Sequence, residues 1–239
     1  MIQLIKGECL EAMKQIPDGS IDAIITDPPY GTTACKWDSV IDFELMWEQL
    51  NRIIKPNGAI VLFGSEPFSS ALRMSNIKNY KYDWKWDKVR GSNFATVKKR
   101  PFNSFEDVAV FYKKQPTYNP QMWTGKPYEK KQGYVGEAKQ TGLKRKEVIS
   151  KSNGERYPLS IIRNGKENGL HPTQKPIKLM EYLIKTYTNE GETVLDFTMG
   201  SGSTGVAAKN LNRNFIGIEQ DQKYFNIAKN RINELRPNR

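Results

Sequence analysis

Two consecutive prolines follow a short apolar run near the start of the chain and fix where that run must end. Residues 21–26 read Ile-Asp-Ala-Ile-Ile-Thr, a composition typical of a strand buried in a parallel sheet, and Asp27-Pro28-Pro29-Tyr30 follow directly. Proline lacks the amide donor of a strand ladder and has a fixed φ, so the strand cannot continue. We therefore predict that this tetrapeptide leaves the carboxyl end of the strand, where open α/β sheets bind ligands.

The chemistry of this tetrapeptide suits a flat ligand that carries an amino group. Its carboxylate and proline carbonyls are hydrogen-bond acceptors, and its aromatic ring offers a stacking surface. A nucleobase with an exocyclic amine has these properties. Asp-Pro-Pro is also an ordinary way to leave a strand, so the functional interpretation needs support from other parts of the sequence.

The remaining pattern predicts strands that alternate with helices. Strands are expected at residues 2–5, 22–26, 59–63, 82–86, 107–112, 193–197 and 215–219, and helices at 9–16, 43–54, 177–188, 203–211 and 222–235. Such alternation predicts an α/β fold with a doubly wound, mostly parallel, seven-stranded sheet. No helical pattern separates residues 82–86 from 107–112, so we expect an antiparallel element at that edge.

Residues 115–170 differ from the rest of the chain. They contain Gly, Pro, Lys, Asn and Tyr without sustained periodicity, and they are too long for an ordinary loop in a compact domain. Their basic and aromatic content favours a functional insertion over a disordered segment. We expect a domain formed by residues 1–114 and 171–239, interrupted by an insertion at 115–170.

Bulk properties exclude several classes of protein. The 239 residues contain no apolar stretch of membrane-spanning length, and the N-terminus does not resemble a signal peptide. Two cysteines, Cys9 and Cys35, and a single histidine, His171, provide neither a disulfide framework nor a metal-ligand pattern. We expect a cytoplasmic protein that does not contact a membrane and has no metal.

The charge of the chain indicates a polyanionic partner. The formal net charge is +11, and Lys and Arg cluster at residues 81–100, 113–151 and the C-terminal tail, where aromatic residues are interspersed. This combination is typical of a nucleic-acid surface with stacking platforms, although a solvated basic surface would have a similar composition. Charge alone does not separate DNA from RNA.

A second motif follows the strand predicted at residues 193–197. Asp196 precedes a glycine-rich turn, Gly200-Ser201-Gly202, and a helix that opens at Ser203 or Thr204. The backbone of such a turn can approach a nucleotide-like cofactor closely. Val206 stands where a P-loop requires Lys, which argues against NTP binding. Glu219 ends the next strand and is placed to accept hydrogen bonds from ribose hydroxyls, so we expect an adenosine site.

The two motifs together resemble the amino-directed DNA methyltransferases that use S-adenosylmethionine, which act on N6 of adenine or N4 of cytosine. The order, with the Asp-Pro-Pro-Tyr motif first and the glycine loop last, resembles their β group. Gly7-Glu8-Cys9 resembles the family's Gly-Asp motif, whose acid contacts the cofactor adenine; here Glu8 replaces Asp. The segment from His171 to Pro176 resembles the element that lines the family's cofactor pocket.

The resemblance implies specific roles for residues of this chain. Catalysis is expected from Asp27, Pro28, Pro29 and Tyr30, with Asp27 and the Pro28 carbonyl accepting the amine hydrogens and Tyr30 stacking on a flipped-out base. Binding of S-adenosylmethionine is expected from Glu8, Cys9, Asp27, Lys175, Asp196, Gly200, Ser201, Gly202, Thr204 and Glu219. His171 is expected to be a packing residue, and Cys35 lacks a nucleophile motif.

The expected reaction is methylation of N6 of adenine in double-stranded DNA, because Asp at the first motif position is usual in the adenine enzymes. The alternatives are N4 of cytosine and then RNA. The resemblance also allows a homodimer and a cognate restriction endonuclease, and assigns target recognition to residues 115–170. Two other classes remain open: a dinucleotide oxidoreductase, supported by the literal G-x-G-x-x-G match at 200–205, and a DNA-binding module without activity.

Overall fold

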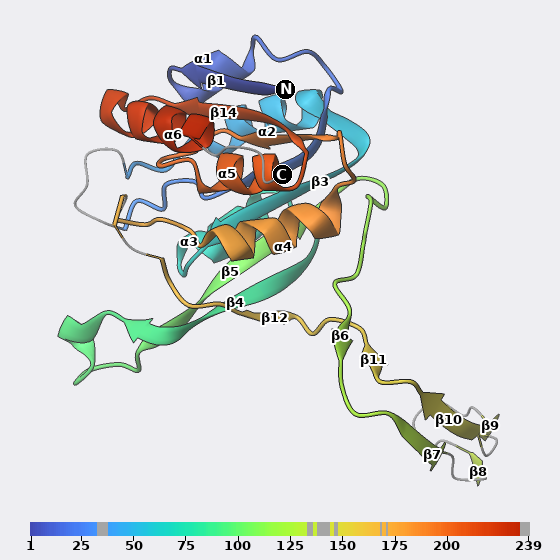
Figure 1. Ribbon diagram of the computed structural model, residues 1–239. Helices are drawn as coiled ribbons and strands as arrows, with labels where there is room; N and C mark the ends of the chain where they lie inside the picture. Colours follow the sequence, from blue (N-terminus) through green and yellow to red (C-terminus); the bar gives the residue numbers. More distant parts are fainter. Residues whose placement is uncertain are drawn as a thin grey trace. The chain divides into compact units, whose positions relative to one another are not determined.

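The chain divides into two compact units in the computed structural model (Figure 1). Met1–Asn119 and Ser160–Arg239 form the large unit, and Pro120–Leu159 form the small unit, which lies within the expected insertion. The structure describes residues 1–32, 38–132, 136–137, 144–145, 148–167, 169–170 and 172–234, with side chains described outside 131–148.

An eight-stranded sheet with the order β1-β14-β13-β2-β3-β5-β4-β12 forms the centre of the large unit. Its strands are β1 (Ile2–Lys6), β2 (Ile21–Thr26), β3 (Ile54–Gly64), β4 (Tyr80–Ser92), β5 (Asn103–Phe111), β12 (Ile161–Arg163), β13 (Thr193–Asp196) and β14 (Asn214–Glu219). The pairs from β1 to β3 are parallel, whereas β5 runs antiparallel to both β3 and β4. The predicted fold class is confirmed, including the antiparallel element.

The eighth strand was not expected. β12 pairs with β4 through Ile161, Ile162 and Arg163, and lies in the segment for which no periodicity was found. Three residues are too few to display an alternating pattern, so only the pairing partner reveals this strand.

Helices cover both faces of the sheet. The core of one face contains residues of α1 (Cys9–Met13), α2 (Phe43–Ile53) and α3 (Phe68–Ser75), and the core of the other contains residues of α4 (Ile177–Tyr187), α5 (Ser203–Asn210) and α6 (Gln222–Glu234). The predicted helices are present; α1 is shorter than expected. α3 was missed because it is short, contains three serines and has no side-chain cap.

Strand β2 is buried between these two layers. Ala23 and Ile25 belong to the core beneath α4 and α5, and Ile24 belongs to the opposite core. All three side chains are fully buried. The near-continuous apolar run therefore reflects a central strand that is covered on both faces.

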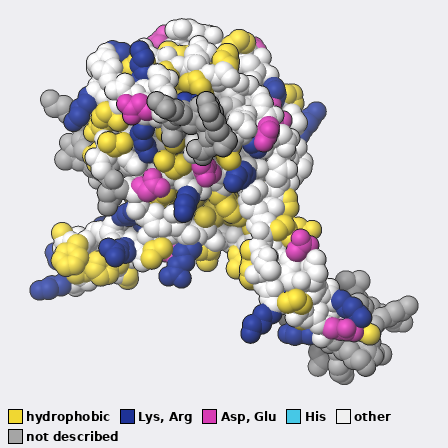
Figure 2. Space-filling model, viewed as in Figure 1, with side chains coloured by type: hydrophobic (Ala, Val, Ile, Leu, Met, Phe, Trp, Pro, Cys, Tyr) yellow, Lys and Arg dark blue, Asp and Glu magenta, His cyan; other side chains and the backbone are white. Residues whose placement is uncertain are grey.

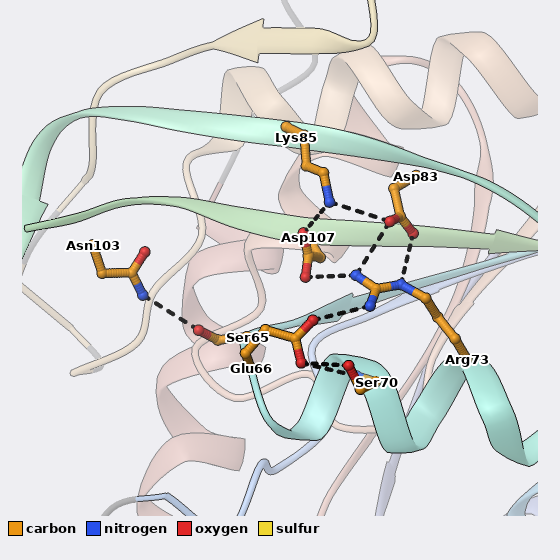
Figure 3. A network of polar contacts seen from close by, with 8 residues as sticks. All are labelled: Ser65, Glu66, Ser70, Arg73, Asp83, Lys85, Asn103 and Asp107. Atoms are coloured by element: carbon orange, nitrogen blue, oxygen red, sulfur yellow. Dashed lines mark hydrogen bonds and ion pairs between the residues drawn. The ribbon is translucent and has the colours of Figure 1, made fainter. Parts of the chain in front are cut away.

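A charged network joins α3 to the antiparallel part of the sheet (Figure 3). Arg73 reaches Asp107 of β5 at 2.7 Å, Asp83 of β4 at 3.2 Å and Glu66 at 3.0 Å. Lys85 adds contacts to Asp83 and Asp107. Asp107 is nearly inaccessible, so its charge depends on these two cations.

The small unit consists of short antiparallel pairs. They are β6 (Trp123–Thr124) with β11 (Glu155–Arg156), β7 (Tyr128–Gln132) with β10 (Val148–Ser152), and β8 (Gly136–Glu137) with β9 (Lys144–Arg145). The Arg156 guanidinium lies 4.8 Å from the centre of the Tyr128 ring.

Within the ranges that the structure describes, no helix is long and apolar enough to span a bilayer.

We predict that Gly205→Ala destabilises the large unit by about 1–3 kcal/mol because a β-carbon there overpacks the core. That atom would lie 2.4 Å from Ile232 Cδ1 and 2.7 Å from Phe215 Cε1. The matched control is Gly165→Ala, where no atom lies within 4 Å of the added carbon. Urea unfolding of both variants measures the difference; equal midpoints would contradict the packing assignment.

Candidate active site

A cavity of about 300 Å³ lies where the loops after β1, β2, β13 and β14 meet. Both sequence motifs line it, with the Asp27–Tyr30 segment on one side and the glycine turn on the other. Parallel strands bring their carboxyl ends to the same sheet edge, which is why motifs distant in sequence meet there. The predicted site residues that line the cavity are Glu8, Cys9, Asp27, Pro28, Pro29, Tyr30, Lys175, Asp196, Gly200, Ser201, Thr204 and Glu219.

Asp27 follows the last residue of β2, and both of its carboxylate oxygens have partners. Oδ1 accepts a hydrogen bond from the Tyr30 hydroxyl, and Oδ2 pairs with the Lys175 ammonium. Burial raises the pKa of Asp27, and the neighbouring ammonium opposes this effect. Burial and the adjacent carboxylate also raise the pKa of Tyr30 well above its usual value, so its hydroxyl remains a donor.

Lys175 lies just before α4, and its side chain is almost fully buried. Its ammonium contacts Asp27 and also lies 3.3 Å from the Glu106 carboxylate. Burial alone would lower the pKa of Lys175, but the two carboxylates raise it above the usual value, so the side chain is charged. The residue expected to contact a cofactor is thus ion-paired with the carboxylate of the Asp-Pro-Pro-Tyr motif.

The glycine turn has the backbone conformation that its sequence predicts. Gly200 and Gly202 have φ values of 51° and 81°, a region that other residues rarely adopt. Helix α5 begins at Ser203, as expected. Glu219 at the end of β14 accepts the Gly200 amide at 2.9 Å through one oxygen and the Asp221 amide at 2.7 Å through the other. Burial raises the pKa of Glu219.

Hydrogen bonds between threonines and Asp196 join the two motifs. Thr26, the last residue of β2, donates to Asp196 Oδ1 and lies 2.7 Å from the Thr198 hydroxyl. Thr198 in turn donates to the Asp27 carbonyl at 3.0 Å, and Thr204 donates to Asp196 Oδ2. The positions of the Asp27 backbone and the glycine turn are therefore coupled through buried side chains.

Glu8 and Cys9 are positioned by the start of α1. Glu8 caps this helix by accepting the Glu11 amide at 2.9 Å, and the Cys9 thiol donates to the other Glu8 oxygen. Burial alone would raise the pKa of Glu8, but amide hydrogen bonds lower it below its usual value. Burial beside this carboxylate raises the pKa of Cys9, which keeps the thiol protonated.

The cavity is acidic although the chain as a whole is basic. Its carboxylates are Glu8, Asp27, Asp38, Asp42, Asp196, Glu219 and Asp221. Among the described residues that line it, the cationic side chain is Lys175. A cationic or neutral ligand with hydroxyl donors fits such a lining, whereas a phosphate chain would face several like charges.

Several residues that shape the site were not predicted. Asp38 accepts the backbone amides of Tyr30, Gly31 and Thr32 at 2.7–2.9 Å and so fixes the chain after the tetrapeptide. The Tyr30 ring stacks on Phe68 with centroids 5.0 Å apart. An Asp that follows a turn by a few residues could have been predicted to accept the backbone amides of that turn. Nothing in the sequence could have predicted the Tyr30–Phe68 contact.

Arg231 of α6 also supports the glycine turn. It donates to the Ser201 carbonyl at 3.0 Å and lies near the hydroxyls of Ser201 and Ser203.

His171 and Cys35 lie outside the described residues. Among the residues that the structure does describe, no cluster of His, Cys, Asp and Glu could hold a metal ion.

We predict that Asp196 makes the protein more stable at mildly acidic than at neutral pH, relative to Asp196→Asn. Burial raises the pKa of Asp196 to about 6. The folded state therefore binds a proton that the unfolded state has already lost, and this stabilisation disappears as the pH rises through about 6. Between about pH 4.5 and pH 7 the wild type should lose about 2 kcal/mol relative to the variant. Unfolding at both pH values measures this difference, and a difference of opposite sign would contradict the assignment.

The chain is similar to known proteins in sequence and in fold. A family model described as DNA methylase, covering N6 and N4 enzymes, matches residues 21–230. The chain is 30% identical to the Type II methyltransferase M.HinfI of Haemophilus influenzae, over 98% of this chain and 69% of that protein. It is 29% identical to the Type II methyltransferase M.HpaI of Haemophilus parainfluenzae, over 96% of this chain and 74% of that protein.

Solved structures share the fold. A complex of M1.HpyAVI with SAM has a TM-score of 0.66 and 30% identity, covering 98% of this chain and 100% of that chain. The cytosine-N4-specific PvuII DNA methyltransferase has a TM-score of 0.68, covers 98% of this chain and 88% of that chain, and has 18% identity, so it supports the fold alone. From the family match and the similarity to M.HinfI, the chain belongs to the N6/N4 DNA methylase family.

Proposed function

We propose that the protein transfers a methyl group from S-adenosylmethionine to the N6 amine of an adenine flipped out of duplex DNA. One observation supports this proposal most strongly: the Asp27 motif and the glycine turn line a single cavity and are joined by the Thr198 hydrogen bond to the Asp27 carbonyl. Methyl transfer requires a donor and an amine acceptor at adjacent positions, and this arrangement provides two adjoining half-sites.

The residues on the glycine side fit S-adenosylmethionine. Glu219 is half-buried and faces the cavity, where its carboxylate oxygens can accept ribose hydroxyls in addition to the two amides. The acidic lining suits a ligand that carries a positively charged sulfonium sulfur. In S-adenosylmethionine this sulfur bears the methyl group and makes it electrophilic. M1.HpyAVI, a structural relative at 30% identity, was solved with SAM.

The residues on the other side fit an exocyclic amine. The Asp27 carboxylate and the Pro28 carbonyl would accept the two hydrogens of the amine. These bonds would favour a pyramidal nitrogen, whose lone pair is no longer conjugated with the ring and can point toward the methyl group. A fixed carboxylate also stabilises the positive charge that develops on nitrogen. Tyr30, which stacks on Phe68 through one ring face, would offer its other face to the base.

Adenine is favoured over cytosine by the Asp at position 27, as the resemblance implies. The fold does not separate the two bases, because the cytosine-N4-specific PvuII enzyme shares it. The acidic cavity argues against the oxidoreductase alternative, because the pyrophosphate of a dinucleotide at the glycine turn would lie near the Asp196 carboxylate. A homodimer and a cognate restriction endonuclease remain proposals from the resemblance.

Two regions are proposed to bind DNA. The first is the tip of the β4–β5 hairpin, residues 89–105, which contains four Lys and Arg residues and no Asp or Glu. Figure 2 shows basic and hydrophobic side chains together at the outer ends of these strands. Its Phe94 is 78% exposed, and Asn93 holds the turn by accepting the Asn103 amide at 2.7 Å. The second is the small unit, within the insertion to which target recognition was assigned.

Transfer of labelled methyl from S-adenosylmethionine to unmethylated bacterial genomic DNA, followed by nucleoside analysis, tests the proposed function. Label in N6-methyldeoxyadenosine is the expected result, and sequencing the marks gives the recognition site. Label in N4-methylcytosine would preserve the chemistry and replace the base. Cofactor binding without label on DNA would move the substrate to RNA.

We predict that Asp27→Ala lowers the turnover number by at least about a hundred-fold, because the amine loses its charged acceptor. Affinity for S-adenosylmethionine, measured by calorimetry, should fall much less than turnover, because Asp27 is one of several expected cofactor contacts and the glycine turn and Glu219 remain. Appreciable residual turnover in this variant would remove Asp27 from the mechanism.

We predict that Lys98→Ala combined with Lys99→Ala weakens DNA binding in a salt-dependent way. Both side chains are exposed at the hairpin tip, and removing a lysine that neutralises one phosphate reduces the salt slope of binding by about one counterion. The control is Lys223→Ala with Lys229→Ala on α6, which are also exposed. Fluorescence anisotropy at several salt concentrations compares the pairs, and equal slopes would exclude the hairpin as a phosphate-binding element.

A further inference from the structure

A row of buried charges extends from Asp27 away from the cavity. The Lys175 ammonium lies between the carboxylates of Asp27 and Glu106, and Glu106 also lies 3.3 Å from the Lys88 ammonium. Lys175 and Lys88 are almost fully buried. Two carboxylates and two ammonium groups thus alternate in sign, and their formal charges cancel.

Asp27 has a limited capacity to accept another donor. Tyr30 donates to its Oδ1 and Lys175 donates to its Oδ2. A target amine that approaches this carboxylate competes with the ammonium, which is charged and the stronger donor. The competition is eased if Lys175 has another acceptor within reach.

Glu106 supplies that acceptor. Its Oε2 is buried, lies 3.3 Å from Lys175 Nζ, and makes no hydrogen bond among the described residues, whereas its Oε1 faces Lys88. Burial alone would raise the pKa of Glu106, but Lys175 and Lys88 lower it, so the carboxylate is charged. Oε2 is thus held by a 3.3 Å ion pair, which is longer than the contact of Lys175 with Asp27, and a small movement of Lys175 would shorten it to a direct hydrogen bond.

The surroundings of Lys175 permit such a movement without exposing its charge. Its ammonium lies 5.1 Å from the Phe63 ring centre and 5.8 Å from the Trp86 ring centre. Aromatic faces attract a cation without fixing its direction as a hydrogen bond does. Lys175 can therefore shift between the two carboxylates while remaining beside these rings.

We propose that Glu106 is a positioning residue that takes over the Lys175 hydrogen bond when the target amine binds to Asp27. The inference rests on the proposed function and extends it. With Lys175 moved to Glu106, Asp27 Oδ2 accepts an amine hydrogen, and the nearby ammonium still holds Asp27 in its ionised form. Glu106 contacts neither methyl donor nor base in this scheme and acts through Lys175.

Glu106→Gln tests the proposal, because it keeps the shape of the side chain and removes its charge. The turnover number should fall by about 10- to 100-fold, while the dissociation constant for S-adenosylmethionine stays within about two-fold of the wild type. Glu106→Asp, which retains the charge, should recover part of the turnover.

The pH profile separates positioning from support of the fold. The titratable groups facing Asp27 are the neutral Tyr30 hydroxyl on its own loop, Lys175 before α4, Glu106 on β5 and Asp196 on β13. Because Glu106 raises the pKa of Asp27, its neutralisation should move the acid limb of the turnover profile to lower pH.

Asp107→Asn is the matched control. Asp107 is the next residue of β5, but its carboxylate lies on the opposite face of the sheet with Arg73 and Lys85 (Figure 3). This variant should lower the unfolding midpoint and leave the acid limb in place.

Three results would overturn the proposal: an unchanged turnover number in Glu106→Gln, a loss explained by a lower folded fraction with an unmoved acid limb, or a comparable loss of cofactor affinity. Failure of the proposed function is distinguishable, because the wild type itself would then label no DNA.

Discussion

The parallel pairing of β2 with β13 is the constraint on which the site depends. Ala23 and Ile24 lie opposite Val194 and Leu195, so the two strands end side by side. Asp27 and Asp196 are therefore placed at the same edge of the sheet, where the carboxyl ends of the strands meet. Both strands are buried on both faces, and a slip by one residue would interchange the side chains that face the two cores. The hydrophobic pattern that forms the sheet therefore also fixes the separation of the two motifs.

The two acids that follow or end these strands are both paired with other side chains of the protein. Asp196 is satisfied by hydroxyls from Thr26 and Thr204 instead of by a cation, whereas Asp27 is paired with a lysine. A carboxylate held by neutral hydroxyls suits a structural role, because its partners do not need to move. A carboxylate paired with an ammonium that has a second acceptor nearby can exchange partners, as the proposed role of Asp27 would require. The two acids at the ends of neighbouring strands are thus suited to different tasks.

Much of the fold could be predicted because buried parallel strands and amphipathic helices have periodic sequences. The Asp-Pro-Pro-Tyr motif, the glycine turn and Glu219 are local in sequence, and the doubly wound topology explains why they meet. What could not be predicted depends on contacts between distant segments. Glu106 resembles any charged residue near the end of a strand until its contact with Lys175 is seen. Arg231 resembles a solvated helix residue until its contact with Ser201 is seen. β12 was missed because three residues are too few to carry a pattern, and α3 because it contains three serines and its start has no capping side chain.

The acidic lining of the cavity affects product release under the proposed reaction. Before transfer the methyl donor carries a sulfonium charge; afterwards the remaining thioether is neutral. A cavity lined by Glu8, Asp27, Asp196 and Glu219 holds the charged form more firmly than the neutral one. The negative potential of the cavity therefore strengthens binding of the charged donor and contributes little to binding of the neutral product. Under the proposed reaction, the electrostatics of the cavity would therefore favour exchange of the neutral product for a fresh, charged donor.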